Sequence, residues 1–100
     1  MLKIALIGAT GSIGRQTLAV IDRHPDEFCL YSAVSRRGGD GFVSLAKIYR
    51  PRFCALADGE SGEKLRGEMP ADVPFYYGKE EALRALDGCD IAVIAASGFA

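Results

Sequence analysis

The sequence predicts an α/β fold with a doubly wound, mostly parallel sheet, and two observations lead to this prediction. Short apolar runs alternate with helical patterns along all 100 residues, in the order βαβαβαβαβ. The apolar runs are nearly continuous, which is typical of parallel strands that helices cover on both faces. Ligands of such open sheets bind beyond the carboxyl ends of the strands. Ligand-binding residues are therefore expected in the segments that follow each strand.

Five segments are predicted as strands because each is short and apolar and is bounded by turn residues. The fourth contains Pro74, which suits a strand start or a sheet edge. The fifth is expected to be a buried strand. The predicted strands are residues 3–7, 28–34, 53–57, 73–77 and 90–96.

Four helices are predicted between these strands, since apolar residues recur there near the 3.6-residue period. Asp58 is a suitable N-cap for the third helix. The predicted helices are residues 15–23, 42–49, 60–67 and 79–86. The residues expected to face the core are Ile13, Leu18, Val20 and Ile21 in the first helix and Ala82, Leu83 and Leu86 in the fourth.

The composition is that of an ordinary globular domain, with 49% hydrophobic and 25% charged residues. A net charge of −1 gives no electrostatic reason to expect nucleic acid or an anionic membrane as partner. No apolar run approaches the ~20 residues of a membrane span. Cys29, Cys54 and Cys89 are far apart and lack metal-ligand spacing, so we expect reduced core cysteines in a cytoplasmic protein.

Three glycines, Gly8, Gly11 and Gly14, follow the first strand directly and lead into the first helix. A strand, a glycine turn and a helix together present backbone N–H groups and a helix N-terminus to a phosphate, as in Rossmann-like dinucleotide-binding folds. Gly8 allows a tight exit from the strand, Gly11 lets a pyrophosphate approach, and Gly14 lets the helix pack closely. Thr10 and Ser12 add hydroxyl groups. The alternative is a plain strand-to-helix turn.

The end of the second strand indicates which dinucleotide is bound. An NAD site usually has an acidic residue there, which accepts a hydrogen bond from the ribose 2′-hydroxyl. This chain has Ser35, Arg36, Arg37 and Gly38 instead. Two guanidinium groups can pair with the 2′-phosphate of NADP(H). The sequence therefore predicts NADP(H) rather than NAD(H), with a solvated basic loop as the alternative.

Catalytic and metal-binding residues are not expected in this chain. His24 is the only histidine, and its place at a helix end suggests a capping or surface role. Asp87 and Asp90 flank a glycine turn but lack a third ligand for a metal. The chain also ends just after its last predicted strand. We therefore expect an incomplete, truncated NADP-binding domain over residues 1–100, with the catalytic and C-terminal domains absent.

Residues 8–21, GATGSIGRQTLAVI, and the following HPDEF resemble the N-terminal part of the 1-deoxy-D-xylulose 5-phosphate reductoisomerase family. Residues 50–58 and 90–98 resemble later segments of the same region. Where the family often has an asparagine after the second strand, this chain has Arg36, Arg37 and Gly38. The resemblance covers the whole chain, but only the first part of a family member.

The resemblance implies an enzyme that rearranges 1-deoxy-D-xylulose 5-phosphate on a divalent metal, Mg or Mn. NADPH then reduces the product to 2-C-methyl-D-erythritol 4-phosphate, in non-mevalonate isoprenoid biosynthesis. The resemblance places the metal ligands outside this chain, and it implies a homodimer at full length and no turnover by these residues alone. It also assigns three groups of NADPH contacts: Thr10, Gly11, Ser12 and Ile13 at the phosphates, Arg36, Arg37 and Gly38 at the 2′-phosphate, and Ala95 and Ala96 near the nicotinamide.

Two other functions are compatible with the same pattern. One is another NADP-dependent reductase, of the semialdehyde or acyl-phosphate type, which would need a catalytic cysteine and histidine further along the chain. The other is a non-catalytic, nucleotide-sensing module. Sequence beyond Ala100 would distinguish these two functions from the reductoisomerase, since an acidic metal cluster is expected only for the reductoisomerase.

Overall fold

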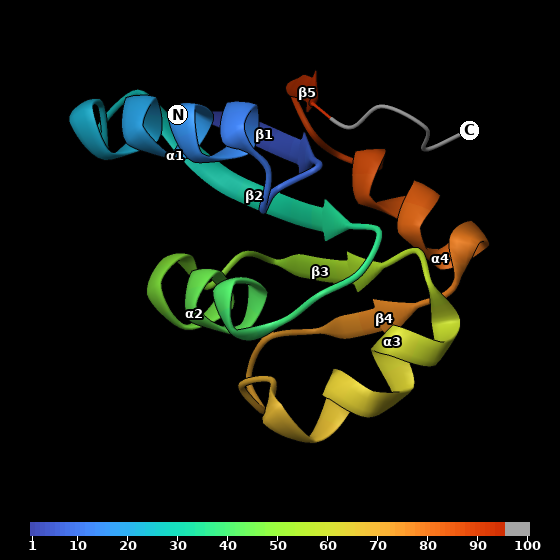
Figure 1. Ribbon diagram of the computed structural model, residues 1–100. Helices are drawn as coiled ribbons and strands as arrows, with labels where there is room; N and C mark the ends of the chain where they lie inside the picture. Colours follow the sequence, from blue (N-terminus) through green and yellow to red (C-terminus); the bar gives the residue numbers. More distant parts are fainter. Residues whose placement is uncertain (96–100) are drawn as a thin grey trace.

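A five-stranded sheet forms the centre of the computed structural model, which describes residues 1–95. The strand order is β4-β3-β2-β1-β5, and each neighbouring pair is parallel (Figure 1). The prediction of a mostly parallel sheet is therefore confirmed, and β4 is the edge strand that Pro74 suggested. The strands are β1 (Leu2–Ile7), β2 (Phe28–Ser35), β3 (Phe53–Leu56), β4 (Phe75–Tyr77) and β5 (Ile91–Ile94).

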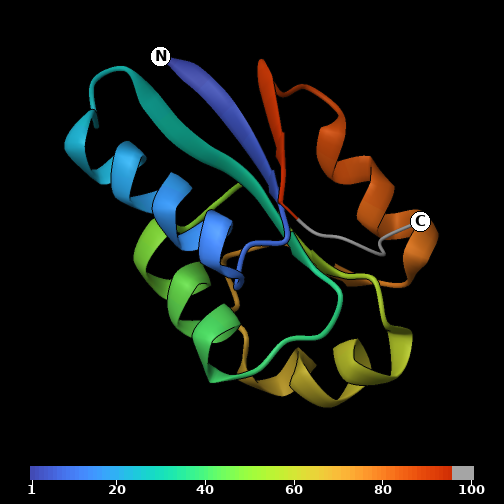
Figure 2. The same ribbon diagram turned by 45° about the horizontal axis from the view of Figure 1, so that its top comes forward.

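Helices cover both faces of this sheet, as the sequence predicted. Figure 2 shows α1, α2 and α3 on one face and α4 on the other. Short 3₁₀ helices continue α3 and α4. The helices are α1 (Ser12–Arg23), α2 (Asp40–Tyr49), α3 (Gly59–Leu65) with η1 (Arg66–Glu68), and α4 (Lys79–Leu83) with η2 (Arg84–Leu86). Among residues 1–95, none of the helices is long and apolar enough to cross a membrane.

Two hydrophobic clusters, one on each face, explain why the central strands are largely apolar on both sides. Successive strand residues point to opposite faces, so Leu6 packs in the larger cluster under α1 and α2 while Ile7 packs with α4 and η2. The larger cluster also contains Phe42 and Leu56, both fully buried. Each central strand is therefore buried on both faces of the sheet.

The inner face of α1 differs from the one predicted. Gly14, Leu18 and Ile21 are buried, whereas Ile13 and Val20 are 54% and 46% exposed. Residues 14, 18 and 21 are spaced by four and three, so they share one stripe of the helix. Ile13 and Val20 form a separate stripe beside it, and the expectation that they face the core was wrong.

The fourth helix and the fifth strand also differ from the predictions. Leu83 is 62% exposed and Leu86 37%, while Ala85 is 1% exposed. The change from α-helix to 3₁₀ helix at Arg84 explains the exposure of Leu86, because a three-residue repeat places Ala85 rather than Leu86 on the same face as the buried Ala82. Leu83, the last residue of the α-helical part, lies beside that face and not on it. Strand β5 is not buried, since it pairs only with β1 within the described part of the chain and Ile94 is 66% exposed.

The cysteines are free thiols, as expected, but only one belongs to the core. Cys54 in β3 is fully buried, whereas Cys29 and Cys89 are partly exposed. The prediction of core cysteines is thus confirmed for Cys54 and wrong for the other two.

Candidate cofactor site

The turn after β1 lies at the carboxyl edge of the sheet and is held to β2. The Gly8 N–H donates to the Val34 carbonyl at 2.7 Å, and the Ala9 N–H donates to the same oxygen at 3.0 Å. Gly8 has φ 91°, in the left-handed region that side chains rarely adopt. This confirms the tight exit from the strand that required glycine at this position.

Gly14 is required by the turn itself. A Cβ at this residue would lie 2.5 Å from the Ala9 carbonyl oxygen and 2.6 Å from that of Gly8. The close approach is therefore between α1 and the turn backbone, and not between α1 and the sheet as the sequence suggested.

Gly11 is different, because the protein leaves room beside it. It is the N-cap of α1 with ordinary extended backbone, φ −81° and ψ 178°, and a Cβ there would meet only the Gly8 oxygen, at 3.5 Å. Among residues 1–95, nothing else lies within 4 Å of this Cβ position, so the backbone of Gly11 is open to a ligand.

The N-terminus of α1 faces the same space. The first helical hydrogen bond runs from the Arg15 N–H to the Gly11 carbonyl at 3.0 Å, so the N–H groups of residues 12–14 precede the hydrogen-bond ladder of the helix. Ser12 and Ile13 are exposed at this end. A twelve-residue helix with exposed N–H groups at its start favours an anion there.

The second predicted segment meets the first at this edge. Ser35, the last residue of β2, is 2% exposed, and its hydroxyl lies 3.2 Å from that of Thr10. Arg36 and Arg37 follow and are exposed. A Cβ on Gly38 would lie 2.7 Å from Leu65 and 2.9 Å from Leu56, so glycine allows this loop to pack over β3 and α3.

Asp58, after β3, is a third component of the site. Its Oδ2 lies 3.9 Å from the Arg37 Nε, and its backbone N–H donates to the Arg36 carbonyl at 2.9 Å. Its carboxylate also accepts a hydrogen bond from the Ser61 N–H, which confirms the predicted N-cap of α3. The Ser61 hydroxyl and N–H, followed by the nearby Arg37 and Arg36 charges, lower the pKa of Asp58.

Sequence reasoning identified Asp58 as a cap but missed its proximity to the arginines. The signal was available, because the carboxyl ends of neighbouring parallel strands share one sheet edge. Asp58 follows β3 as Arg36 follows β2, and the two strands are paired.

Ala95 completes the edge on the side of β5. Its N–H donates to the Ile7 carbonyl at 2.8 Å, which places it beside the start of the glycine turn. The other predicted residue of this segment, Ala96, lies outside the described residues. The remaining predicted contacts, from Gly8 to Gly14 and from Ser35 to Gly38, gather at the same edge.

The other candidates considered in the sequence have structural roles or none. His24 is the C-cap of α1, with its N–H donating to the Val20 and Ile21 carbonyls. The Asp90 carboxylate accepts a hydrogen bond from the Lys3 backbone N–H at 2.8 Å. Within residues 1–95, no three His, Cys, Asp or Glu side chains are grouped so that they could hold a metal ion.

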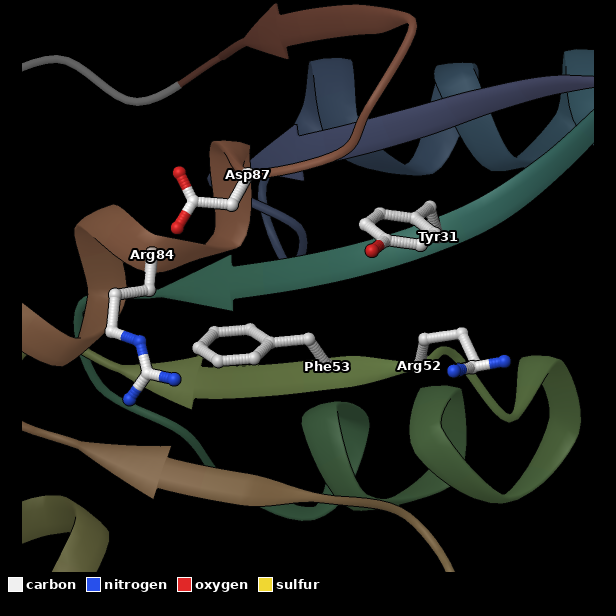
Figure 3. A pocket seen from close by; sticks show the side chains of 5 residues that line it. All are labelled: Tyr31, Arg52, Phe53, Arg84 and Asp87. Carbon is white, nitrogen blue, oxygen red and sulfur yellow. The ribbon is translucent and has the colours of Figure 1, made fainter.

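A pocket on the α4 face of the sheet is separate from this edge. Figure 3 shows Tyr31 and Phe53 on neighbouring strands and Arg84 and Asp87 on the η2 side of the pocket. Arg52 completes the lining. None of these residues is among the predicted cofactor contacts.

The parallel sheet, the glycine turn and the arginine loop at its carboxyl edge define a Rossmann-like domain of the dinucleotide-binding class. The model of the 1-deoxy-D-xylulose 5-phosphate reductoisomerase family matches residues 4–100. The chain belongs to this family.

Individual relatives agree with this assignment. The chain is 37% identical over 100 residues to 1-deoxy-D-xylulose 5-phosphate reductoisomerase of Geobacillus sp. (strain WCH70), covering 98% of this chain and 26% of the relative. The enzyme of Ralstonia nicotianae is 31% identical, with 100% of this chain and 27% of the relative covered. The chain thus spans about a quarter of the length of these relatives.

Solved structures show the same fold. The reductoisomerase from Zymomonas mobilis in complex with NADPH matches with a TM-score of 0.82 and 25% identity, over 91% of this chain and 24% of that chain. A reductoisomerase in complex with NADPH, fosmidomycin and magnesium matches with a TM-score of 0.75 and 24% identity, over 96% and 24% of the two chains. The comparisons give no support to the two alternative functions.

Proposed function

We propose that this chain forms the NADPH-binding part of a 1-deoxy-D-xylulose 5-phosphate reductoisomerase. The observation that carries the proposal is the meeting of three segments at one sheet edge: the glycine turn, the arginine loop and Ala95. Each follows a different strand, and parallel pairing brings them together. The family membership and the NADPH complex of the Zymomonas mobilis relative support the same assignment.

The residues at this edge fit a dinucleotide phosphate. The open space beside Gly11 would admit the pyrophosphate, and the N–H groups that start α1 would donate hydrogen bonds to it. The Thr10 and Ser12 hydroxyls lie at the same end, and Ile13 is exposed next to them. Among the described residues, the position of a Cβ on Gly11 has only the Gly8 oxygen near it, which supports a cradle open to the phosphate.

Arg36 and Arg37 would hold the 2′-phosphate end of the cofactor. Both are exposed, and both follow the strand whose end lies beside the adenosine ribose in this class of fold. Their guanidinium groups can donate paired hydrogen bonds to phosphate oxygens. Ala95, across β1 from this loop, would border the nicotinamide side, and we extend this proposal to Ala96.

The bound NADPH would supply the hydride for the reductive step. The rearrangement of the ketose phosphate on Mg or Mn is assigned to residues outside this chain, on the family resemblance. On the same ground we propose that residues 1–100 form an incomplete domain and do not turn over the substrate alone. A cytoplasmic homodimer at full length is also part of the proposal.

Removal of the two arginines tests the cofactor assignment. We expect Arg36→Ala combined with Arg37→Ala to weaken NADPH binding by about 100-fold or more, because hydrogen bonds to charged groups contribute roughly 1.5–3 kcal/mol each and the variant removes at least two. NADH, which lacks the 2′-phosphate, should bind nearly unchanged. Calorimetric titration of both nucleotides measures the two affinities.

The matched control is Arg23→Ala with Arg66→Ala, which removes two exposed arginines outside the cofactor edge. That variant should keep the preference for NADPH. Equal affinities of the wild type for NADPH and NADH would contradict the assignment. At full length, NADPH oxidation with the ketose phosphate and a divalent metal tests the enzymatic activity.

A further inference from the structure

We propose that Asp58 limits the preference of this site for NADPH over NADH, because its carboxylate adds a fixed negative charge to the 2′-phosphate subsite. This inference rests on the proposed function and adds a specificity-determining residue to it. The sequence after β2 contributes two positive charges, those of Arg36 and Arg37. The structure adds the negative charge of Asp58, which follows β3.

The position of Asp58 is fixed from two sides. Its N–H donates to the Arg36 carbonyl, and the Ala57 N–H donates to the Ser35 carbonyl, both at 2.9 Å. The loop after β3 is therefore bonded to the loop after β2 along its backbone. The side chain is held by Ser61 at the start of α3. The carboxylate cannot turn away from the arginines without leaving the helix cap.

The charge of Asp58 is present at neutral pH. Its hydrogen bonds to Ser61 and the nearby arginines lower the pKa of the carboxyl from its ordinary value of 3.8. The carboxylate is half-buried, with 36% of the side chain exposed, while the Arg37 side chain is 72% exposed. Water therefore screens the pair only in part. The two arginines and the aspartate together present one net positive charge.

A 2′-phosphate carries close to two negative charges and would share Arg37 with this carboxylate. Repulsion between phosphate and carboxylate opposes binding, whereas a 2′-hydroxyl experiences no such repulsion. The same carboxylate caps α3. A neutral cap would serve the helix equally and relieve the repulsion, since asparagine and serine are as good at this position as aspartate.

The test is Asp58→Asn, measured in the protein at its natural length. We expect the affinity for NADPH to rise by about three- to tenfold, the size of one partly screened charge beside a phosphate. The affinity for NADH should stay within about twofold, because it lacks the 2′-phosphate. Titration of 2′,5′-ADP and 5′-AMP gives the same comparison without the nicotinamide half.

Three controls accompany this variant. Asp58→Ser keeps a side chain that can cap α3 and should also raise the affinity for NADPH. The test therefore does not depend on the folding of a single variant. Glu68→Gln removes an exposed negative charge beyond the far end of α3 and should leave both affinities unchanged. High salt should reduce the gain of Asp58→Asn, because it screens the charge that the variant removes.

The possible outcomes separate this inference from the proposed function. If the wild type binds 2′,5′-ADP no better than 5′-AMP, the 2′-phosphate assignment fails. If the wild type discriminates but Asp58→Asn binds 2′,5′-ADP equally or more weakly, the inference is overturned, and Asp58 instead positions Arg37. A parallel rise for 5′-AMP and 2′,5′-ADP would also overturn it, since the effect would not depend on the 2′-phosphate.

Discussion

Gly11 and Gly14 lie one helical turn apart at the start of α1, and the structure separates their roles. A Cβ on Gly14 would overlap two carbonyl oxygens of the turn, whereas a Cβ on Gly11 would have ordinary contact with one. Gly14 is therefore a requirement of the fold, whereas the fold would accept a side chain at Gly11, and we propose that the ligand requires this glycine. The sequence pattern contains both glycines but cannot tell the two requirements apart.

Alanine at each position should show this difference. We expect Gly11→Ala to lower the free energy of unfolding by less than ~1 kcal/mol, because alanine is a poorer N-cap residue than glycine. The same variant should weaken NADPH binding more than about tenfold, because the added methyl group occupies the place of the ligand. Gly14→Ala should cost roughly 1–3 kcal/mol or more, because backbone atoms must shift. Chemical denaturation and nucleotide titration on both variants provide the measurements.

Gly41→Ala is the control for glycine replacement as such. Gly41 lies in α2, and a Cβ there would meet nothing within 4 Å. Alanine should stabilise the helix by up to about 1 kcal/mol. If Gly11→Ala destabilised the fold as much as Gly14→Ala, both glycines would be requirements of the fold.

At the scale of elements, sequence reasoning predicted the strands and their parallel arrangement but misplaced some faces. The strands were recognisable because β1, β2 and β3 are apolar on both sides. The exposure of Leu86 could not be predicted from periodicity, since nothing in the residues marks the change to 3₁₀ geometry at Arg84. The exposure of β5 depends on its neighbours in the sheet, which the segment does not itself encode.

The position of η2 over the sheet depends on one buried hydrogen bond. The Ser32 hydroxyl, in β2, donates to the Ala85 carbonyl at 2.7 Å, and both residues are almost fully buried. The bond joins segments 53 residues apart. It explains why a serine interrupts an otherwise apolar strand.

Ser32→Ala should therefore destabilise the protein by roughly 1–3 kcal/mol, because it leaves the Ala85 carbonyl buried without this donor. The matched variant Ser44→Ala changes an exposed serine on α2 and should be neutral or slightly stabilising. Denaturant midpoints of the two variants give the comparison. Equal midpoints would show that water or another donor replaces the Ser32 hydroxyl.

At the scale of the whole molecule, the site is a consequence of topology. The glycine turn, the arginine loop and Asp58 are separated along the chain, and they meet because β1, β2 and β3 are parallel neighbours. This part of the site could be predicted from the sequence, since alternating strands and helices imply parallel pairing. The 3.9 Å separation between Arg37 and Asp58 could not, because it depends on where α3 begins.

Cys54 lies in an interior strand of the sheet, so its reactivity reports whether the sheet is intact. It lies in β3, opposite Ala33 of β2 and Phe75 of β4, and is fully buried. Burial raises the pKa of the Cys54 thiol to about 12. Since only the thiolate is reactive, a thiol reagent at pH 8 can modify Cys54 only after the sheet opens.

Bound NADPH should therefore slow the modification of Cys54, because a ligand that binds only the folded state lowers the open population by the factor 1 + [L]/Kd. At 100 times Kd, we expect about 100-fold protection. Mass spectrometry of alkylated peptides follows Cys54 in the same sample as the partly exposed Cys29 and Cys89, which should react without opening. In the double arginine variant the protection should require correspondingly more NADPH. Modification of Cys54 that NADPH does not slow would show that β3 opens locally, without loss of the cofactor site.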